Sequence, residues 1–495
     1  MDPYTATQDA IQLLRAIYEA YNTYQESDTA VSDARLCLQS VEVRLELFGQ
    51  CLKGNSSRLT DRQRSVIGRS LDRVSDILRE LGEKLPAKTT ISTKLVWVGW
   101  GKRRAEGLLE ELRKWEQSTQ GTFFLLDLVG KLRDAKGVDD LRKRLFETGD
   151  LTFAGAWSLS KRIYALDKDA SPSDTPRLPS PSVILPQDAA NLHRTLGVSG
   201  EDTVYLEAHY IDEGSDDRRK KDIQSVQRLA HVFQSAEFDL SPLHLLPSVG
   251  LIEQYDFDRC YVVYKLPFQL PISHHVPTLA LAIERQARIT LEDRFRIAME
   301  VTVAVLSVHA AGWVHKNIRS DNILIDIRNN DQDPKATAVV GTAYLVGFQS
   351  VRPRIEGSDQ LPELDPVKRL YQHPERQGGR DTKVAKFDIR HDMYSLGAVL
   401  VELGYRKTLR EIFQVKNSSS EPGPREAATN HNNLLKHAHR LTDKMGTKYA
   451  NAAVVCLTKS TMTGKPVEVL REEFYDGVLC PLREILAGFQ VTDSK

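Results

Sequence analysis

The residues best suited to chemistry lie in one short stretch, 306–325. It places an imidazole, two amides and a guanidinium within eight positions, at His315, Asn317, Arg319 and Asn322. Arg319 is a cation that can meet a phosphate group. The amide of Asn317 is no useful general base, and Asn322 alone is a poor magnesium ligand because that cation prefers carboxylates and phosphates. The stretch therefore suits phosphate recognition better than bond-breaking chemistry.

The spacing of these residues resembles the catalytic loop of the protein kinases, whose pattern is H-R-D-L-x-x-x-N. His315, Ile318 and Asn322 keep their places. Lys316 stands at the arginine position and Asn317 at the aspartate position. The stretch before the loop resembles the end of a long helix that leads into it.

Three further matches follow in the order that the kinases have. Residues 344–349 lie where a strand leads into D-F-G, residues 373–375 (His-Pro-Glu) where A-P-E closes the activation segment, and residues 392–397 where the next helix begins. The resemblance extends from about 187 to 486. It implies a bilobal protein-kinase-like fold.

The departures from the kinase pattern affect separate parts of the mechanism. A kinase needs one carboxylate to accept the proton of the substrate hydroxyl and another to hold magnesium. The first aligns with Asn317 and the second with Gly347, which has no side chain. No lysine or arginine lies between Arg194 and Arg218 to anchor ATP, and the glycine-rich phosphate loop is missing. His209 is the nearest substitute, and its reference pKa of ~6.5 leaves it only partly charged near neutrality.

The resemblance assigns roles to individual positions. The degenerate catalytic residues are His315, Asn317 and Arg319, and the nucleotide-binding positions are His209, Asn322 and Gly347. Asn322 is also the position left for a metal. The ligands implied are ATP and magnesium, and the lost groups imply weak binding or none.

The elements that must position these residues change type along the chain. Residues 204–206, 251–252 and 261–264 are short and rich in large apolar residues, as strands are. Residues 291–311 follow a helical pattern, and a further helix is expected over 223–235 after a solvated charged loop at 212–221. Strands followed by helices predict an α+β domain over residues 187–495.

The first 167 residues predict an all-α helical bundle. Apolar residues recur at helical spacing through 11–24, 29–52, a segment that begins at Thr60-Asp61, and 101–128. In the first helix, packing in a core is favoured over membrane insertion because charges interrupt it. A Ser/Pro-rich stretch at 168–186 predicts a linker. The helix layout, the 95–102 segment and the kinase-like domain behind it resemble fungal proteins with a HeLo-type (prion-inhibition and propagation) domain. The same order of parts is similar to the animal pseudokinase that executes necroptosis.

Composition excludes several other classes of protein. The 495 residues carry 67 basic and 67 acidic side chains, so the chain has no net charge that would predict nucleic-acid binding. Five scattered cysteines form no CxxC pair, which favours a reducing, cytoplasmic location over a disulfide framework. No stretch reaches the ~18 uncharged apolar residues of a spanning helix. Membrane association on activation stays open.

These observations predict a pseudokinase that signals through protein partners and regulates its helical bundle in cell death or incompatibility, with peripheral membrane contact as one outcome. The first alternative is an atypical active kinase that uses ATP and magnesium, with Asp321 or Asp326 as the substitute carboxylate. The second alternative is a non-enzymatic scaffold.

Overall fold

The computed structural model describes the chain in segments. They are residues 3–22, 29–52, 61–84, 107–112, 115, 155–156, 158–160, 162–163, 183–184, 193–211, 216–234, 240–254, 258–270, 276–328, 339–348, 352–353, 363, 365–377, 384–415, 424–460 and 467–490. The chain divides into two compact units, Met1–Trp157 and Ser158–Lys495. Most of the predicted linker at 168–186, the 95–102 segment and most of the predicted helix at 101–128 lie outside the described residues.

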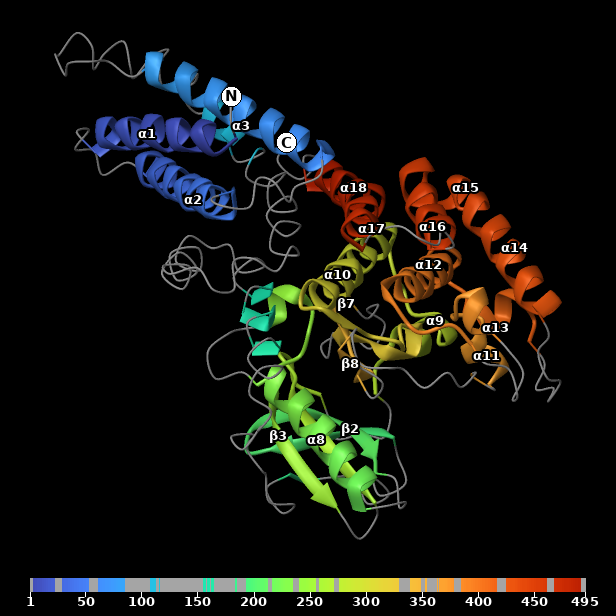
Figure 1. Ribbon diagram of the computed structural model, residues 1–495. Helices are drawn as coiled ribbons and strands as arrows, with labels where there is room; N and C mark the ends of the chain where they lie inside the picture. The colour runs from blue at the N-terminus through green and yellow to red at the C-terminus, as the bar shows by residue number, and fades with distance from the viewer. Residues whose placement is uncertain are drawn as a thin grey trace. The chain divides into compact units, whose positions relative to one another are not determined.

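The first unit contains three long helices, α1 (Pro3–Asn22), α2 (Thr29–Leu52) and α3 (Asp61–Lys84), with a helical turn at 107–112. Helix α1 packs against both α2 and α3 (Figure 1). Its apolar side is buried in a shared core, where Leu14 is fully inaccessible, and on its polar side Arg15 pairs with Glu42 and Glu46 at 2.6 Å each. The predicted bounds of α2 are confirmed, and α1 is a core helix.

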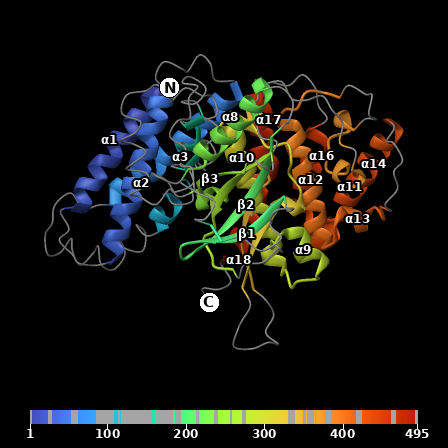
Figure 2. The same cartoon turned by 90° about the horizontal axis from the view of Figure 1, so that it is seen from below.

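The sheet of the second unit has four antiparallel strands in the order β1-β2-β4-β3 (Figure 2). They are β1 (Arg194–Ser199), β2 (Asp202–Tyr210), β3 (Ser248–Gln254) and β4 (Arg259–Lys265). The three strands predicted from sequence lie in β2, β3 and β4. Strand β1 escaped prediction because its sequence, RTLGVS, has a glycine in the middle and little alternation.

Helix α8 (Asp216–Val232) packs on β3 and β4 (Figure 1). It begins seven residues before the predicted helix at 223, so the interpretation of 212–221 as a solvated loop is wrong for residues 216–221. Acidic side chains at Asp216 and Asp217 favour a helix N-terminus, and basic residues four positions later add i,i+4 attraction. The charged run therefore forms the first turns of the helix.

The rest of the unit is mainly helical (Figure 1). Its larger helices are α9 (Leu279–Glu284), α10 (Leu291–Ala310), α12 (Ile389–Tyr405), α14 (Pro424–Arg440), α16 (Thr447–Lys459), α17 (Val467–Phe474) and α18 (Cys480–Gln490). Short helices are α11 (Pro366–Arg369), α13 (Leu409–Ile412), α15 (Thr442–Met445), the 3-10 turns η5 (Ser241–Leu243), η7 (Ser320–Asn322) and η9 (Pro374–Arg376), and the π-turn η10 (Tyr475–Leu479). The strand pairs are β5 (Trp313–Val314) with β8 (Arg352–Pro353), and β6 (Ile323–Arg328) with β7 (Val339–Leu345).

Helices α10 and α12 carry the loops of interest. Helix α10 starts with a capping box between Thr290 and Asp293 and is buried along most of its length. It packs on β7 and α18, while α12 packs on α16. The unit is thus mixed helix and sheet, as the sequence predicts. Among the described residues no helix is long and apolar enough to cross a membrane.

Candidate functional site

The loop after α10 is anchored by one buried carboxylate. Asp392, in the first turn of α12, accepts the main-chain N–H groups of His315 (2.7 Å) and Lys316 (2.8 Å) and contacts Nε2 of His309 at 2.9 Å. Burial raises the pKa of Asp392, but these hydrogen bonds and the charge of His309 outweigh it, so the pKa is lowered. Lys316 adopts a left-handed φ of 68°. The carboxylate therefore holds a tight bend at the start of the loop.

His315 is packed inside the protein. Its Nδ1 accepts the N–H of Asn317 at 3.2 Å, and its ring lies 4.6 Å from that of Phe348, which in turn lies 4.6 Å from Phe233. Burial lowers the pKa of His315 to about 4, so the ring is neutral at neutral pH. With no exposed surface, it supports the loop and does not meet a ligand.

The two loop amides and Gly347 form a closed network. Asn322 Nδ2 donates to the main-chain oxygen of Asn317 at 2.7 Å, and Asn317 Nδ2 donates to that of Gly347 at 3.3 Å. Gly347 has φ +88°, and a Cβ there would lie 2.5 Å from Cγ of Asn322. An aspartate at 347 cannot fit beside Asn322 in this conformation.

Strand β2 presents a glutamate to the same turn. Glu207 is fully buried, and its Oε2 accepts the N–H of Gly347 at 2.9 Å. His209, two residues along the strand, has Nε2 3.7 Å from Oε1 of Glu207. Burial lowers the pKa of His209 to about 4, so it brings no positive charge at neutral pH. The side chain of β2 that contacts the turn is therefore a hydrogen-bond acceptor, where a lysine would be a donor.

A cation reaches the loop from the neighbouring strand. Arg194, the first residue of β1, donates through Nη1 to the main-chain oxygen of Asp321 and to Oδ1 of Asn322, the latter at 3.2 Å. Its Nη2 lies 3.6 Å from Oδ2 of Asp321. Arg319 Nε lies 3.1 Å from the other carboxylate oxygen. Asp321 is thus shared between two guanidinium groups.

This donor set does not fit magnesium. The cation prefers several oxygen ligands that include a carboxylate. Asn322 Oδ1 is bonded to Arg194, Asp321 is paired with two arginines, and Gly347 offers no side chain. Two cations already occupy the acceptors that a metal would need.

A cavity of about 530 Å³ is lined in part by the loop residues Arg319, Ser320 and Asp321. Ser320 and Tyr371 lie in its wall, and Ser320 Oγ is 3.1 Å from Tyr371 Oη. Tyr371 donates to Oε1 of Glu402 at 2.6 Å, and the N–H of Leu409 donates to the same oxygen. Burial raises the pKa of Glu402 to about 7, although these hydrogen bonds act in the opposite direction. Hydrogen bonds through the hydroxyl groups of Ser320 and Tyr371 thus connect the cavity wall to the buried carboxyl group of Glu402.

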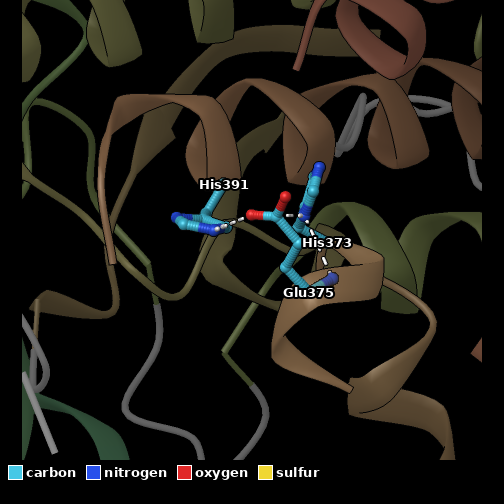
Figure 3. Close-up of side chains that lie close together, drawn as sticks. All are labelled: His373, Glu375 and His391. Atoms are coloured by element: carbon cyan, nitrogen blue, oxygen red, sulfur yellow. Dashed lines mark hydrogen bonds and ion pairs between the residues drawn. The ribbon is translucent and has the colours of Figure 1, made fainter. Parts of the chain in front are cut away.

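A second cluster lies at the start of α12. Figure 3 shows Glu375 between the rings of His373 and His391, with Oε2 3.8 Å from a nitrogen of each. Both rings are buried, and burial lowers their pKa values to about 3 and about 4. Arg390 also approaches Glu375, at 3.6 Å.

The hydrogen bonds of this cluster argue against a metal site. Nδ1 of His373 accepts the N–H of Glu375 at 3.2 Å, and Nδ1 of His391 accepts that of Asp388 at 2.8 Å. Each neutral ring must therefore carry its proton on Nε2. A histidine that binds a metal through one nitrogen normally donates a proton from the other. The rings fasten the segment at 373–375 to α12.

The predicted site residues do not all converge. Asn317, Asn322 and Gly347 contact one another, Arg319 joins them through Asp321, and His315 and His209 are buried behind them. Sequence reasoning missed Arg194 and Glu207 because it searched β2 for a cation. These two residues face each other across the β1–β2 pair. A basic and an acidic residue lie opposite each other in a hairpin that is otherwise mainly apolar, and this pattern could have identified them.

Comparison with known proteins gives one informative similarity. The chain is 24% identical to the serine/threonine-protein kinase pkn3 of Myxococcus xanthus over 134 residues. The match covers 26% of this chain and 23% of that kinase. No family model matches the chain. The similarity supports a kinase-like region in this protein.

Proposed function

We propose that the second unit is a bilobal protein-kinase-like domain that does not transfer phosphate and works as a signalling pseudokinase. The observation that carries the proposal is the bond between Glu207 and Gly347. Residues 204–207 read V-Y-L-E, which has the spacing of the kinase motif V-A-I-K with glutamate in place of the lysine that binds phosphates. A kinase would bring together a lysine and a magnesium-binding aspartate at this point. This chain brings together a carboxylate and a glycine N–H.

Charge strengthens the argument. The phosphates of ATP are anionic, and in a kinase the lysine of this strand attracts them. Glu207 supplies no positive charge at this position. His209 is neutral and cannot compensate.

The rival proposal, an active atypical kinase, needs a substitute carboxylate. Asp321 forms ion pairs with Arg194 and Arg319. Asp326 is buried in β6, and a Cβ on Gly341 would lie 2.5 Å from its Oδ2. Asp321, which lines the cavity, is therefore the carboxylate on which the rival depends.

The test is a phosphate-transfer assay on the full chain with radiolabelled ATP, magnesium and a general protein substrate. We expect no incorporation above the background without protein, both for the full chain and for its Asp321→Ala variant. Incorporation that Asp321→Ala abolishes would establish the rival and overturn the proposal.

We also propose that the first unit is a HeLo-like effector which the kinase-like domain restrains in cell-death signalling, through protein partners and with membrane contact on release. The support is its separate apolar core, which gives it the means to fold as a unit. Flotation of the full chain and of residues 1–157 with anionic vesicles tests this. Binding by residues 1–157 alone is the expected result, and no binding by either would leave a scaffold role.

A further inference from the structure

Arg194 and Glu207 are a cross-strand pair in which each side chain makes a contact outside the sheet. They are directly opposite each other in the β1–β2 register. Opposite residues in an antiparallel pair project from the same face of the sheet. Each side chain instead reaches out of the sheet to a different segment, Arg194 to the loop before β6 and Glu207 to the turn after β7.

The two contacts differ in kind. The Glu207 side chain accepts a main-chain N–H inside the protein at 2.9 Å, and the Arg194 guanidinium meets three acceptors on two adjacent residues. The Arg194 contact is charge-assisted, and such hydrogen bonds are roughly twice as strong as neutral ones. The two contacts end close together, because Asn322 lies against Gly347.

We propose that Arg194 and Glu207 are the two arms of a latch that holds the sheet closed on the loop without a nucleotide, and that release of this latch is the regulated step of the domain. The inference rests on the proposed function in one respect, namely that the closed cleft needs no ATP. In a nucleotide-dependent kinase the ligand bridges the two sides of the cleft. In this chain two side chains of the sheet make that bridge.

The matched control is another ion pair of the same sheet. Lys265 Nζ lies 2.7 Å from Oδ2 of Asp202, linking β4 to the start of β2. Both of these side chains are nearly half exposed, and the pair stays within the sheet. Lys265→Gln therefore removes a sheet cation without touching the latch.

The test measures the opening directly in the full chain. Spin labels are placed at Lys220→Cys on α8 and Lys436→Cys on α14, both exposed, after replacement of the native cysteines by alanine. Pulsed electron spin resonance then gives the distance distribution with wild-type latch residues, with Arg194→Gln, with Glu207→Gln and with Lys265→Gln. Unchanged circular dichroism shows that each variant is folded.

We expect a single narrow distance for the wild-type latch and for Lys265→Gln. Arg194→Gln should raise the open population roughly tenfold, as expected when a charge-assisted contact is lost. Glu207→Gln, which keeps an acceptor for Gly347, should give a smaller rise. Distributions of Arg194→Gln and Lys265→Gln that coincide would overturn the latch. Phosphate transfer by the wild-type chain would instead refute the proposed function, so the two failures are distinguishable.

Discussion

Replacement of Gly347 by alanine tests the geometry of the site most sharply. Gly347 has φ +88°, and a Cβ there would meet Asn322 at 2.5 Å. A left-handed conformation costs an L-residue about 1 to 2 kcal/mol. Forcing a methyl group into a packed site adds about 1 to 3 kcal/mol. We therefore expect Gly347→Ala to lower the free energy of unfolding by about 2 to 5 kcal/mol.

Gly312 provides the matched control. It has φ +86°, yet nothing lies within 4 Å of a Cβ at this position. Gly312→Ala should show the backbone strain alone, about 1 to 2 kcal/mol. The stabilisation that alanine gives by restricting the unfolded chain is common to both variants and cancels in their difference. That difference, about 1 to 3 kcal/mol, isolates the contact with Asn322.

The assay is urea unfolding of the full chain followed by tryptophan fluorescence and circular dichroism. Adding Asn322→Ala to Gly347→Ala should recover part of the loss, because it removes the atoms in conflict. Equal losses for Gly347→Ala and Gly312→Ala would refute the close approach of Asn322 to the turn, and with it the argument that an aspartate cannot fit at 347.

Three further outcomes follow from buried polar groups. Five histidines, the buried His209, His315, His373 and His391 and the partly buried His244, have pKa values lowered to about 3 or 4. Because the unfolded chain binds protons at these histidines below pH ~6.5 and the folded protein does so only near 4, stability should fall with pH across this window. From pH 7.5 to 5.5 each histidine lowers the free energy of unfolding by about 1 kcal/mol, whereas Glu402, whose pKa is raised to about 7, adds about 2 kcal/mol. We expect urea unfolding to show a net loss of several kcal/mol, and an unchanged stability would contradict this. Tyr371→Phe should cost about 1 to 3 kcal/mol, and more at pH 8 than at pH 6, because its hydroxyl stabilises the ionised form of Glu402; a pH-independent loss would contradict the link. Thr290→Ala should lower the thermal midpoint through the loss of about 1 kcal/mol of helix capping, while no change would show that the cap of α10 contributes nothing.

Regular elements were predictable where the pattern is local. The bounds of α2 follow from helical spacing of apolar residues, and α10 follows from the same pattern after a capping residue. Strand β1 was missed because apolar and polar residues alternate only weakly along its six positions. Its hydrogen-bonded pairing with β2 defines the strand, and that pairing is not visible in the local sequence. The early start of α8 was missed because a run of charged residues was interpreted as a solvated loop. In a helix, acidic and basic side chains four positions apart attract each other, and that spacing predicts the first turns.

The candidate site was predictable only in part. The loop residues Asn317, Asn322 and the turn at Gly347 were identified from spacing, but the absence of a cation on β2 led to His209. The structure supplies Arg194 from the adjacent strand. Glu207 and His209 are two residues apart in β2 and project from the same face, so alternation could not choose between them. Glu207 was passed over because a cation was expected at this position.

The claim that the altered site of the second unit no longer binds ATP with magnesium is tested most directly by thermal unfolding of the full chain with increasing ATP, with and without magnesium. A ligand that binds the folded state stabilises it by about 2.7 kcal/mol at one hundred times its dissociation constant. With Glu207 at the lysine position and Asp321 paired with Arg194 and Arg319, we predict no magnesium-dependent rise in the midpoint at millimolar ATP. A rise that requires magnesium, and that Asn322→Ala removes, would contradict the account.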